Sequence, residues 1–225
     1  MLTGRNRRKT HGGIPQGSTC GLASRLNIYY QWNTGENAEL WIDSSGNDNN
    51  AVQDTEESAP TTVTGGGLHF DGVNDFMDFT LFTVSADTQF LLFMVIELDG
   101  YGGAYVSDSA NELFRNVNAN SQSIKLTGTG KSISHGPGTF TTPASEKLVL
   151  TFYRNSGDDV FVAKNGLVYD PSINDNSTFD LANLATKAES GNFFDGKIYD
   201  IGVASSFSAE QNINKEMITD YLCTK

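Results

Sequence analysis

Two acidic residues at alternate positions, Glu97 and Asp99, form the pair in this 225-residue sequence that best fits hydrolytic chemistry. Glycoside hydrolysis needs two carboxyl groups across the scissile bond, one protonated as the acid and one ionised as nucleophile or base. Because side chains alternate along a strand, both carboxylates are predicted to share one face of a sheet. The next alternate position holds Tyr101, and Gly100 is expected to end the strand. The pair is therefore interpreted as the solvent-exposed end of a strand.

Nucleophilic catalysis has little support elsewhere in the sequence. The three histidines, His11, His69 and His135, are scattered, and no Gly-x-Ser-x-Gly segment supplies the turn that exposes a serine nucleophile. Cys20 and Cys223 have no neighbouring base in the sequence, and they are either free thiols or a bond between the two ends of the chain. We therefore predict that the chain is not an enzyme.

Oxygen-bearing side chains collect in two short loops. Calcium prefers six to eight carboxylate, amide and carbonyl oxygens, so these loops are candidate calcium sites. The candidate ligands are Asp43 and Asp48 in the first loop, together with Asn49, and Asp71, Asn74 and Asp75 in the second, with Asp195 and Asp200 later in the chain. The same residue types form backbone hydrogen bonds in tight turns, which is the competing interpretation. No zinc-binding spacing occurs, and no cofactor is expected to be required.

Three aromatic residues lie in glycine-rich, loop-like sequence, where exposed rings can stack on sugars. These candidates for glycan binding are Tyr101, Tyr105 and Phe140. Packing in the core of a β-sandwich is the competing interpretation for each ring.

The basic residues are concentrated at the start of an otherwise acidic chain. The formal net charge is −12, yet residues 1–30 contain no acid, and Arg5, Arg7, Arg8 and Lys9 lie close together. Residues 1–24 show no strand or helix periodicity, so we expect an extended basic arm before a single domain over residues 25–225. Because the acidic remainder repels phosphate, the arm is predicted to bind a protein partner in preference to nucleic acid.

The rest of the sequence has the pattern of short strands joined by turns. Strands are expected over residues 26–32, 39–42, 67–70, 76–79, 90–97, 113–117, 123–126 and 194–203, with a three-strand meander over residues 148–169. Residues 90–97 are apolar throughout, so this strand is predicted to be covered on both faces. The Asn165-Gly166 pair favours a two-residue hairpin turn. After Ser208, apolar residues at helical spacing predict a short C-terminal helix.

Residues 1–30 lack the apolar stretch of a secretory signal, and the run over residues 90–96 is too short to span a bilayer. We therefore expect neither a secretory signal nor membrane association.

Four short sequence segments occur in an informative order along the chain. They are LWIDSSGN at residues 40–47, LHFDGVNDF at 68–76, a V-x-x-Asn-Gly hairpin at 162–166 and FDGKIYDI at 194–201. Over residues 26–225 the chain resembles the laminin-G-like and concanavalin-A-like lectin and glucanase superfamily. The resemblance implies an all-β, two-sheet antiparallel jelly-roll sandwich with a short C-terminal helix. It does not imply one function, because this fold is found in lectins, glycosidases, adhesion modules and virion proteins.

Relatives of the laminin-G type often hold calcium near such loops. The glucanase branch carries three acids at alternate positions on one strand, and Tyr101 stands here in place of the third.

A basic, glycine-rich start joined to such a domain also resembles structural proteins of tailed phages. The first hypothesis is a non-catalytic virion protein assembled in the host cytoplasm, either a capsid decoration or a tail-associated subunit. Its arm would bind a capsid or tail protein, and its jelly roll would be displayed on the particle. The sequence leaves open whether the protein forms a homo-oligomer. The alternative hypothesis is a carbohydrate-binding module, assisted by calcium or not, that recognises surface polysaccharide.

Overall fold

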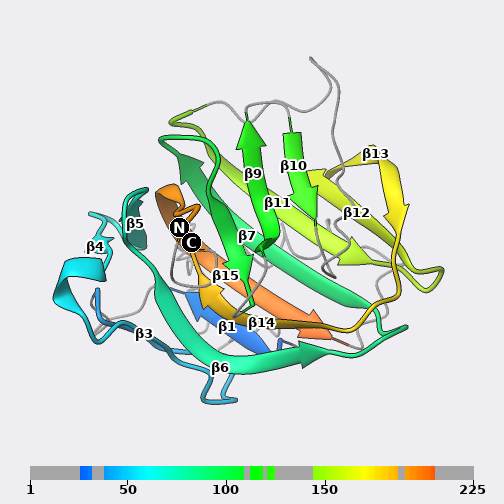
Figure 1. The fold of residues 1–225 in the computed structure, drawn as a ribbon, viewed down its shortest axis with the longest axis horizontal. Helices are drawn as coiled ribbons and strands as arrows, with labels where there is room; N and C mark the ends of the chain where they lie inside the picture. The colour runs from blue at the N-terminus through cyan, green and yellow to red at the C-terminus, as the bar shows by residue number, and fades with distance from the viewer. Residues whose placement is uncertain are drawn as a thin grey trace, which may run out of the picture.

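The structure is a computed structural model that describes residues 26–31, 38–108, 112–118, 121–124, 144–186 and 191–205. These residues form two antiparallel sheets that face each other as a sandwich (Figure 1). The predicted all-β, two-sheet antiparallel fold is therefore confirmed. The segments predicted to form a basic arm, residues 1–24, and a C-terminal helix after Ser208 lie outside the described residues.

Sheet A contains eight strands of the described chain. They are β1 Ile28–Gln31, β4 Thr61–Thr62, β5 Leu68–Asp71, β7 Phe90–Leu98, β11 Lys147–Arg154, β12 Asp159–Lys164, β13 Leu167–Asn174 and β15 Asp195–Ser205. Their order across the sheet is β13, β12, β11, β7, β15, β5 and β4. Strand β15 pairs with β7 on one side, and on its other side with β5 near its start and β1 near its end. The paired strands β7 and β15 are therefore the centre of the sheet.

Sheet B contains seven strands of the described chain. They are β2 Leu40–Trp41, β3 Ala51–Val52, β6 Met77–Val84, β8 Ala104–Ser107, β9 Glu112–Asn118, β10 Ser121–Ile124 and β14 Phe179–Leu184. Their order is β10, β9, β8, β14, β6, β3 and β2. A short 3₁₀ helix, Glu56–Ser58, precedes β4. Among the residues that the structure describes, no helix has the length and apolar character needed to cross a bilayer.

Aromatic rings from both sheets fill the space between them. Phe114 of β9 lies 4.8 Å from Phe152 of β11, and Phe90 of β7 lies 4.9 Å from Phe179 of β14 in an edge-on arrangement, measured between ring centroids. Such offset and edge-on contacts are the favoured arrangements of aromatic rings. These contacts join the two sheets through the core.

Strand β7 is buried on both faces, as its continuous apolar sequence predicted. Phe90, Leu92, Met94, Ile96 and Leu98 point into the space between the sheets. The alternate side chains contribute to a second apolar cluster on the other face of sheet A, formed by Leu26, Tyr29, Leu91, Phe93 and Ala204. The central strand is thus fixed by packing from both sides as well as by its two neighbours.

Most predicted strands agree with the structure, but four strands were not predicted, namely the two-residue strands β3 and β4 and the longer strands β8 and β14. Strand β8 lies in a glycine-rich segment that the sequence presents as a loop, and β14 lies in a polar stretch with weak alternation. The Asn165-Gly166 turn is confirmed, because both residues have positive φ and connect β12 to β13. Strands β8 and β14 both belong to sheet B and pair with each other.

Arg154, at the end of β11, joins two loops at one end of the sandwich. Its guanidinium is fully buried, and Nε donates a hydrogen bond to the Thr88 carbonyl at 2.7 Å. Nη2 donates to the Ser85 carbonyl at 2.9 Å. Nη1 donates to the carbonyls of Asp175 at 3.2 Å and Ser177 at 2.8 Å. The first two carbonyls lie in the β6–β7 connection and the other two in the β13–β14 connection, so one side chain holds together two connections that cross between the sheets.

We expect Arg154→Met to destabilise the protein by about 3 kcal/mol or more, because the fully buried guanidinium and its hydrogen bonds to four carbonyl oxygens are lost. Urea denaturation should show a lower midpoint with an unchanged slope. Lys164→Met, which removes a partly exposed cation from β12, is the control and should change stability by less than about 1 kcal/mol. Equal losses of stability in the two variants would show that the four hydrogen bonds of Arg154 contribute no more to the free energy of unfolding than a surface cation does.

Candidate functional site

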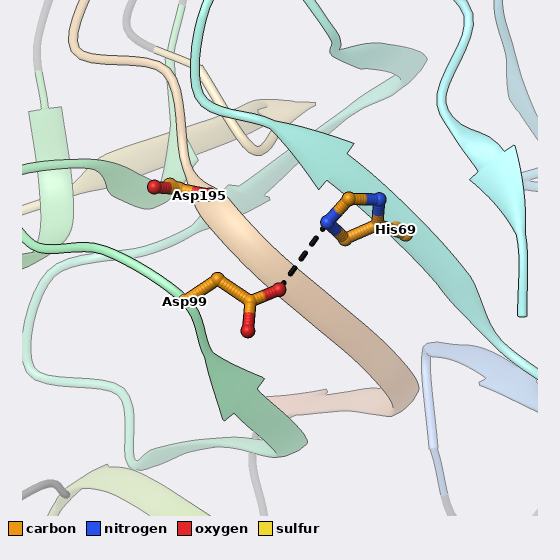
Figure 2. A group of neighbouring side chains, drawn as sticks. All are labelled: His69, Asp99 and Asp195. Atoms are coloured by element: carbon orange, nitrogen blue, oxygen red, sulfur yellow. Dashed lines mark ion pairs between the residues drawn. The ribbon is translucent and has the colours of Figure 1, made fainter. Parts of the chain in front are cut away.

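Three side chains from three strands meet on the outer face of sheet A, at the ends of β5, β7 and β15. Figure 2 shows His69 on β5, Asp99 just after β7 and Asp195 at the start of β15. One ligand atom from each side chain lies within 4.8 Å of the other two. His69 Nε2 lies 3.3 Å from Asp99 Oδ2, and both side chains are about one-third exposed. We call these three residues the outer-face cluster.

Strand pairing explains why these side chains meet. Lys197 of β15 pairs with Glu97 of β7 and with His69 of β5, so these three side chains form one row on the outer face. Asp195 pairs with Asp71, and its carbonyl accepts the backbone N–H of Asp99 at 3.1 Å. Asp71, Asp99 and Asp195 therefore form a second row, and each lies two residues from the first-row residue of its own strand. The intervening side chains point inward and are fully buried, namely Leu68, Ile96, Leu98 and Ile198.

Two glycines make room for the Asp195 side chain. A Cβ added to Gly100 would lie 2.1 Å from Asp195 Oδ2, and one added to Gly72 would lie 2.7 Å from Asp195 Cβ. Gly72 also has a φ of +74°, which favours glycine. Both positions look like ordinary turn glycines in the sequence, but in the structure they form a cradle for one carboxylate.

A charged row adjoins the cluster. Lys197 Nζ is hydrogen-bonded to Glu97 and lies 3.9 Å from Asp99 Oδ2. The Tyr199 hydroxyl donates to Glu97 Oε2 at 2.9 Å, and Lys147 Nζ lies 3.5 Å above the Tyr199 ring. The hydrogen bond from Lys197 lowers the pKa of Glu97, with a further contribution from Tyr199. A glycosidase acid needs a raised pKa, so Glu97 is unsuited to that role.

Asp195 has the opposite electrostatic environment. Burial raises its pKa, and the neighbouring charge of Asp99 raises it further, although His69 opposes this effect. Among the described residues, no donor makes a hydrogen bond to its carboxylate. Asp195 is thus a carboxylate beside another carboxylate, without a lysine or arginine partner of its own.

The outer-face cluster can do two kinds of chemistry. One imidazole nitrogen and two carboxylates are a donor set that suits a divalent transition-metal ion. The same groups, with the neighbouring ammonium and phenol, can exchange hydrogen bonds with the hydroxyl groups of a sugar. Tyr101, two residues beyond Asp99, is 45% exposed and offers an aromatic ring nearby in the sequence.

The structure separates the predicted glycan-binding aromatic residues. Tyr101 is exposed, as stacking on a sugar requires. The prediction for Tyr105 is wrong, because it is fully buried in β8 and its ring packs against Phe152 at 6.1 Å and Phe194 at 5.6 Å. Phe140 lies outside the described residues, as do Arg5, Arg7, Arg8 and Lys9 of the arm and both cysteines.

The first predicted calcium loop is organised as a turn. The Asp43 carboxylate accepts backbone N–H groups from Tyr29 at 2.9 Å, Ser45 at 2.9 Å and Asn49 at 3.1 Å. Asp48 is exposed and has a φ of +58°. These contacts account for the Asp43 carboxylate without an ion, and calcium binding in this loop stays a prediction.

The second predicted calcium loop has the same character. Asp71 Oδ1 accepts the N–H groups of Val73 and Asn74, and Asp75 Oδ2 accepts the N–H of Asp71 at 2.9 Å. The Asn74 amide donates to the Glu57 carbonyl. The loop nevertheless borders the outer-face cluster, because its Gly72 contacts Asp195.

The sequence singled out each of the three residues separately, but it did not predict that they lie together. His69 was considered as a catalytic base, Asp99 as half of a carboxylate pair and Asp195 as a late calcium ligand. One sequence signal could have indicated the site, because all three strands have two polar residues at alternate positions at this end of the sheet. The pairs are His69 and Asp71, Glu97 and Asp99, and Asp195 and Lys197.

A second surface feature lies at the other end of β7. A shallow open depression of about 410 Å³ is lined by Asp87, Thr88, Gln89 and Ser156. It contains no aromatic ring, and it overlies the loops held by Arg154. The outer-face cluster is therefore the stronger candidate site.

Comparison with solved structures identifies the fold as a lectin-like β-sandwich. The chain matches a Trypanosoma rangeli sialidase with a TM-score of 0.55 and 13% identity over 80% of this chain and 30% of that one. It matches the receptor-binding domain of botulinum neurotoxin D with a TM-score of 0.57 and 12% identity over 90% of this chain and 54% of the other. A botulinum neurotoxin serotype D ligand-binding domain in complex with N-acetylneuraminic acid gives a TM-score of 0.60 and 13% identity, over 91% and 52%.

These likenesses concern the fold alone. The chain spans between 30% and 54% of the length of these three proteins, and they include both an enzyme and binding domains. No protein-family model and no curated protein sequence matches the chain.

We expect Asp195→Asn to stabilise the protein at neutral pH, by less than about 1 kcal/mol because the group is partly exposed. The raised pKa of Asp195 means that its ionised form disfavours the folded state. The gain should therefore be largest above the folded pKa and should disappear as the pH falls below the pKa of the unfolded chain. Urea denaturation between pH 3 and pH 7 in the presence of a chelator measures this dependence.

Glu97→Gln supplies the contrast, because the pKa of Glu97 is lowered. Its ionised form favours the folded state, so this substitution should destabilise the protein at neutral pH. The loss should fade as the pH falls through the lowered pKa. The same sign for both substitutions would contradict the electrostatic description of the site.

Proposed function

We propose that the chain is a non-catalytic carbohydrate-binding module and that its ligand lies against the outer-face cluster and the row beside it. The observation that carries this proposal is the meeting of His69, Asp99 and Asp195 on an open face of a lectin-like sandwich. All three are at least partly exposed, although they lie beside the fully buried core of sheet A. Polar groups held on a rigid sheet are suited to orienting a ligand with many hydroxyl groups.

Both kinds of hydrogen-bonding group occur at the site. The carboxylates of Asp99 and Asp195 accept hydrogen bonds from sugar hydroxyls, while Lys197 donates them. The exposed ring of Tyr101 can cover the apolar face of a sugar ring. Because Glu97 is already bound by Lys197 and Tyr199, it acts mainly to position Lys197.

The charge of the surface favours neutral sugars. The chain has a formal net charge of −12, and the site adds the acids of its second row to this field. An anionic sugar such as the N-acetylneuraminic acid bound by the botulinum domain would be repelled at long range. We therefore expect neutral polysaccharides to bind better than sialylated ones.

A glycan array followed by titration of the best ligand tests this proposal. We expect Tyr101→Ala to weaken binding about tenfold, since an aromatic contact contributes about 1 kcal/mol or more. Asp99→Asn should also weaken binding, because a charged acceptor becomes a neutral amide.

Leu81→Ala is the control for this experiment. Leu81 is 58% exposed on β6 of sheet B, so its loss removes an apolar side chain from the other sheet. Binding should be unchanged by this substitution. An array without signal at high protein concentration, or equal weakening by all three substitutions, would contradict the proposal.

The basic arm supports a second role as an attached subunit of a particle. Its four clustered cations contrast with the acidic remainder of the chain, so the arm can bind an acidic partner surface while the sandwich is displayed. We propose this role as a virion or other particle protein, such as a capsid decoration or tail-associated subunit. The two roles are compatible, because a displayed subunit can also bind glycans.

We expect the full-length chain to capture an assembly protein from its source, and the variant with Arg5, Arg7, Arg8 and Lys9 all changed to Gln to capture at least about tenfold less. Loss of four charge contacts removes the long-range attraction that the arm supplies. The same comparison at high salt should weaken capture by the unaltered chain. Equal capture by both chains would remove the arm from the mechanism of attachment.

A further inference from the structure

We propose that the outer-face cluster binds one divalent first-row transition-metal ion, with His69 Nε2 and the carboxylates of Asp99 and Asp195 as its three protein ligands. The proposal concerns a different set of ligands and a different kind of ion from the calcium expected in the loops of Asp43 and Asp71, and it shares with that expectation only Asp195. It does not depend on the proposed glycan binding, because the ion can bind in the absence of any sugar.

The donor set selects the class of ion. An imidazole nitrogen beside two carboxylate oxygens suits zinc and its neighbours, whereas calcium takes six to eight oxygens. Asp99 and Asp195 together supply two negative charges, which match a divalent cation. Lys197 balances these charges only in part, because its ammonium is hydrogen-bonded to Glu97 and lies 3.9 Å from Asp99.

The distances are close to those of a metal site. A tetrahedral ion with bonds of about 2.0–2.1 Å separates its ligand atoms by about 3.3 Å. His69 Nε2 and Asp99 Oδ2 already lie 3.3 Å apart, and all three ligand atoms lie within 4.8 Å of one another. A modest rotation of the Asp195 side chain therefore completes the set, and the remaining position is open to water or ligand.

The surroundings of Asp195 give independent support. Gly72 and Gly100 leave space for its carboxylate that a Cβ on either residue would occupy. Among the described residues, no hydrogen-bond donor satisfies this carboxylate, and the carboxylate of Asp99 lies beside it. A bound cation would supply the missing compensation for the two neighbouring carboxylates.

Strand pairing makes the three ligands a rigid set. His69 lies on β5, Asp195 lies on β15 and Asp99 follows β7, and the backbones of these three strands are joined by hydrogen bonds at this level. Sites on strands hold their ligands more firmly than sites on loops, which favours metal binding without a large ordering cost.

Titration of the full chain with cobalt chloride tests the proposal, with visible absorption and calorimetry as readouts. We expect one site whose affinity falls at least about 100-fold in His69→Asn and in Asp195→Asn, because each loses one of three ligands. Asp54→Asn, which removes an exposed acid that is not a member of the cluster, should bind cobalt as the unaltered protein does. Affinity should also fall on acidification, because the ligands bind the ion only when deprotonated.

Thermal unfolding in the presence of a chelator checks that the variants are folded. If one of them is not folded, the isosteric Asp99→Asn variant takes its place, with the same expected loss. The proposal is overturned if the unaltered chain binds no cobalt. It is equally overturned if folded cluster variants bind cobalt with undiminished affinity, because the ion would then be held elsewhere, for example by the cysteines.

Discussion

The pairing of β7 with β15 is the constraint on which the rest of the structure depends. The two strands are about a hundred residues apart in the sequence, and their pairing runs from Gly196 opposite Leu98 to Ser205 opposite Phe90. It decides which side chains face the core and which face outward, because a shift of one residue would reverse every side chain. The outer-face cluster exists only in this register, which brings Asp195 beside Asp99 and Lys197 beside Glu97.

Glycines on β15 allow this pairing to be close. A Cβ on Gly196 would lie 2.3 Å from the Glu97 carbonyl oxygen, and one on Gly202 would lie 2.1 Å from the Phe93 ring. Gly196 allows close pairing at the polar end of β15. Gly202 leaves space for Phe93 in the apolar cluster on the outer face of sheet A. One strand thus connects a polar surface to a packed apolar one, and Arg154 independently holds the loops at the opposite end of β7.

Local sequence signals predicted the elements better than the site. The apolar run of β7 and the Asn165-Gly166 turn depend on neighbours in the sequence, and both are confirmed. Tyr105 was assigned to a loop because glycines precede it, but pairing with β9 and β14 makes its segment a buried strand. The meeting of His69 with Asp99 and Asp195 depends on contacts between distant strands, which residue spacing alone does not reveal.

The electrostatic interactions within the outer-face cluster are unfavourable compared with those of the adjoining row. This favours a role for the cluster in binding a ligand over a role in stabilising the fold. Asp99 and Asp195 are held side by side by backbone pairing, although like charges in such proximity repel each other. The adjoining row shows that the same sheet can satisfy an acid fully, because Glu97 has both an ammonium and a phenol as partners. Residues that were needed only for solubility would have no reason to require glycines at two neighbouring positions. A carboxylate that is given space but no hydrogen-bond donor is more readily explained by a partner from outside the chain, since functional sites commonly retain interactions that the fold alone does not favour.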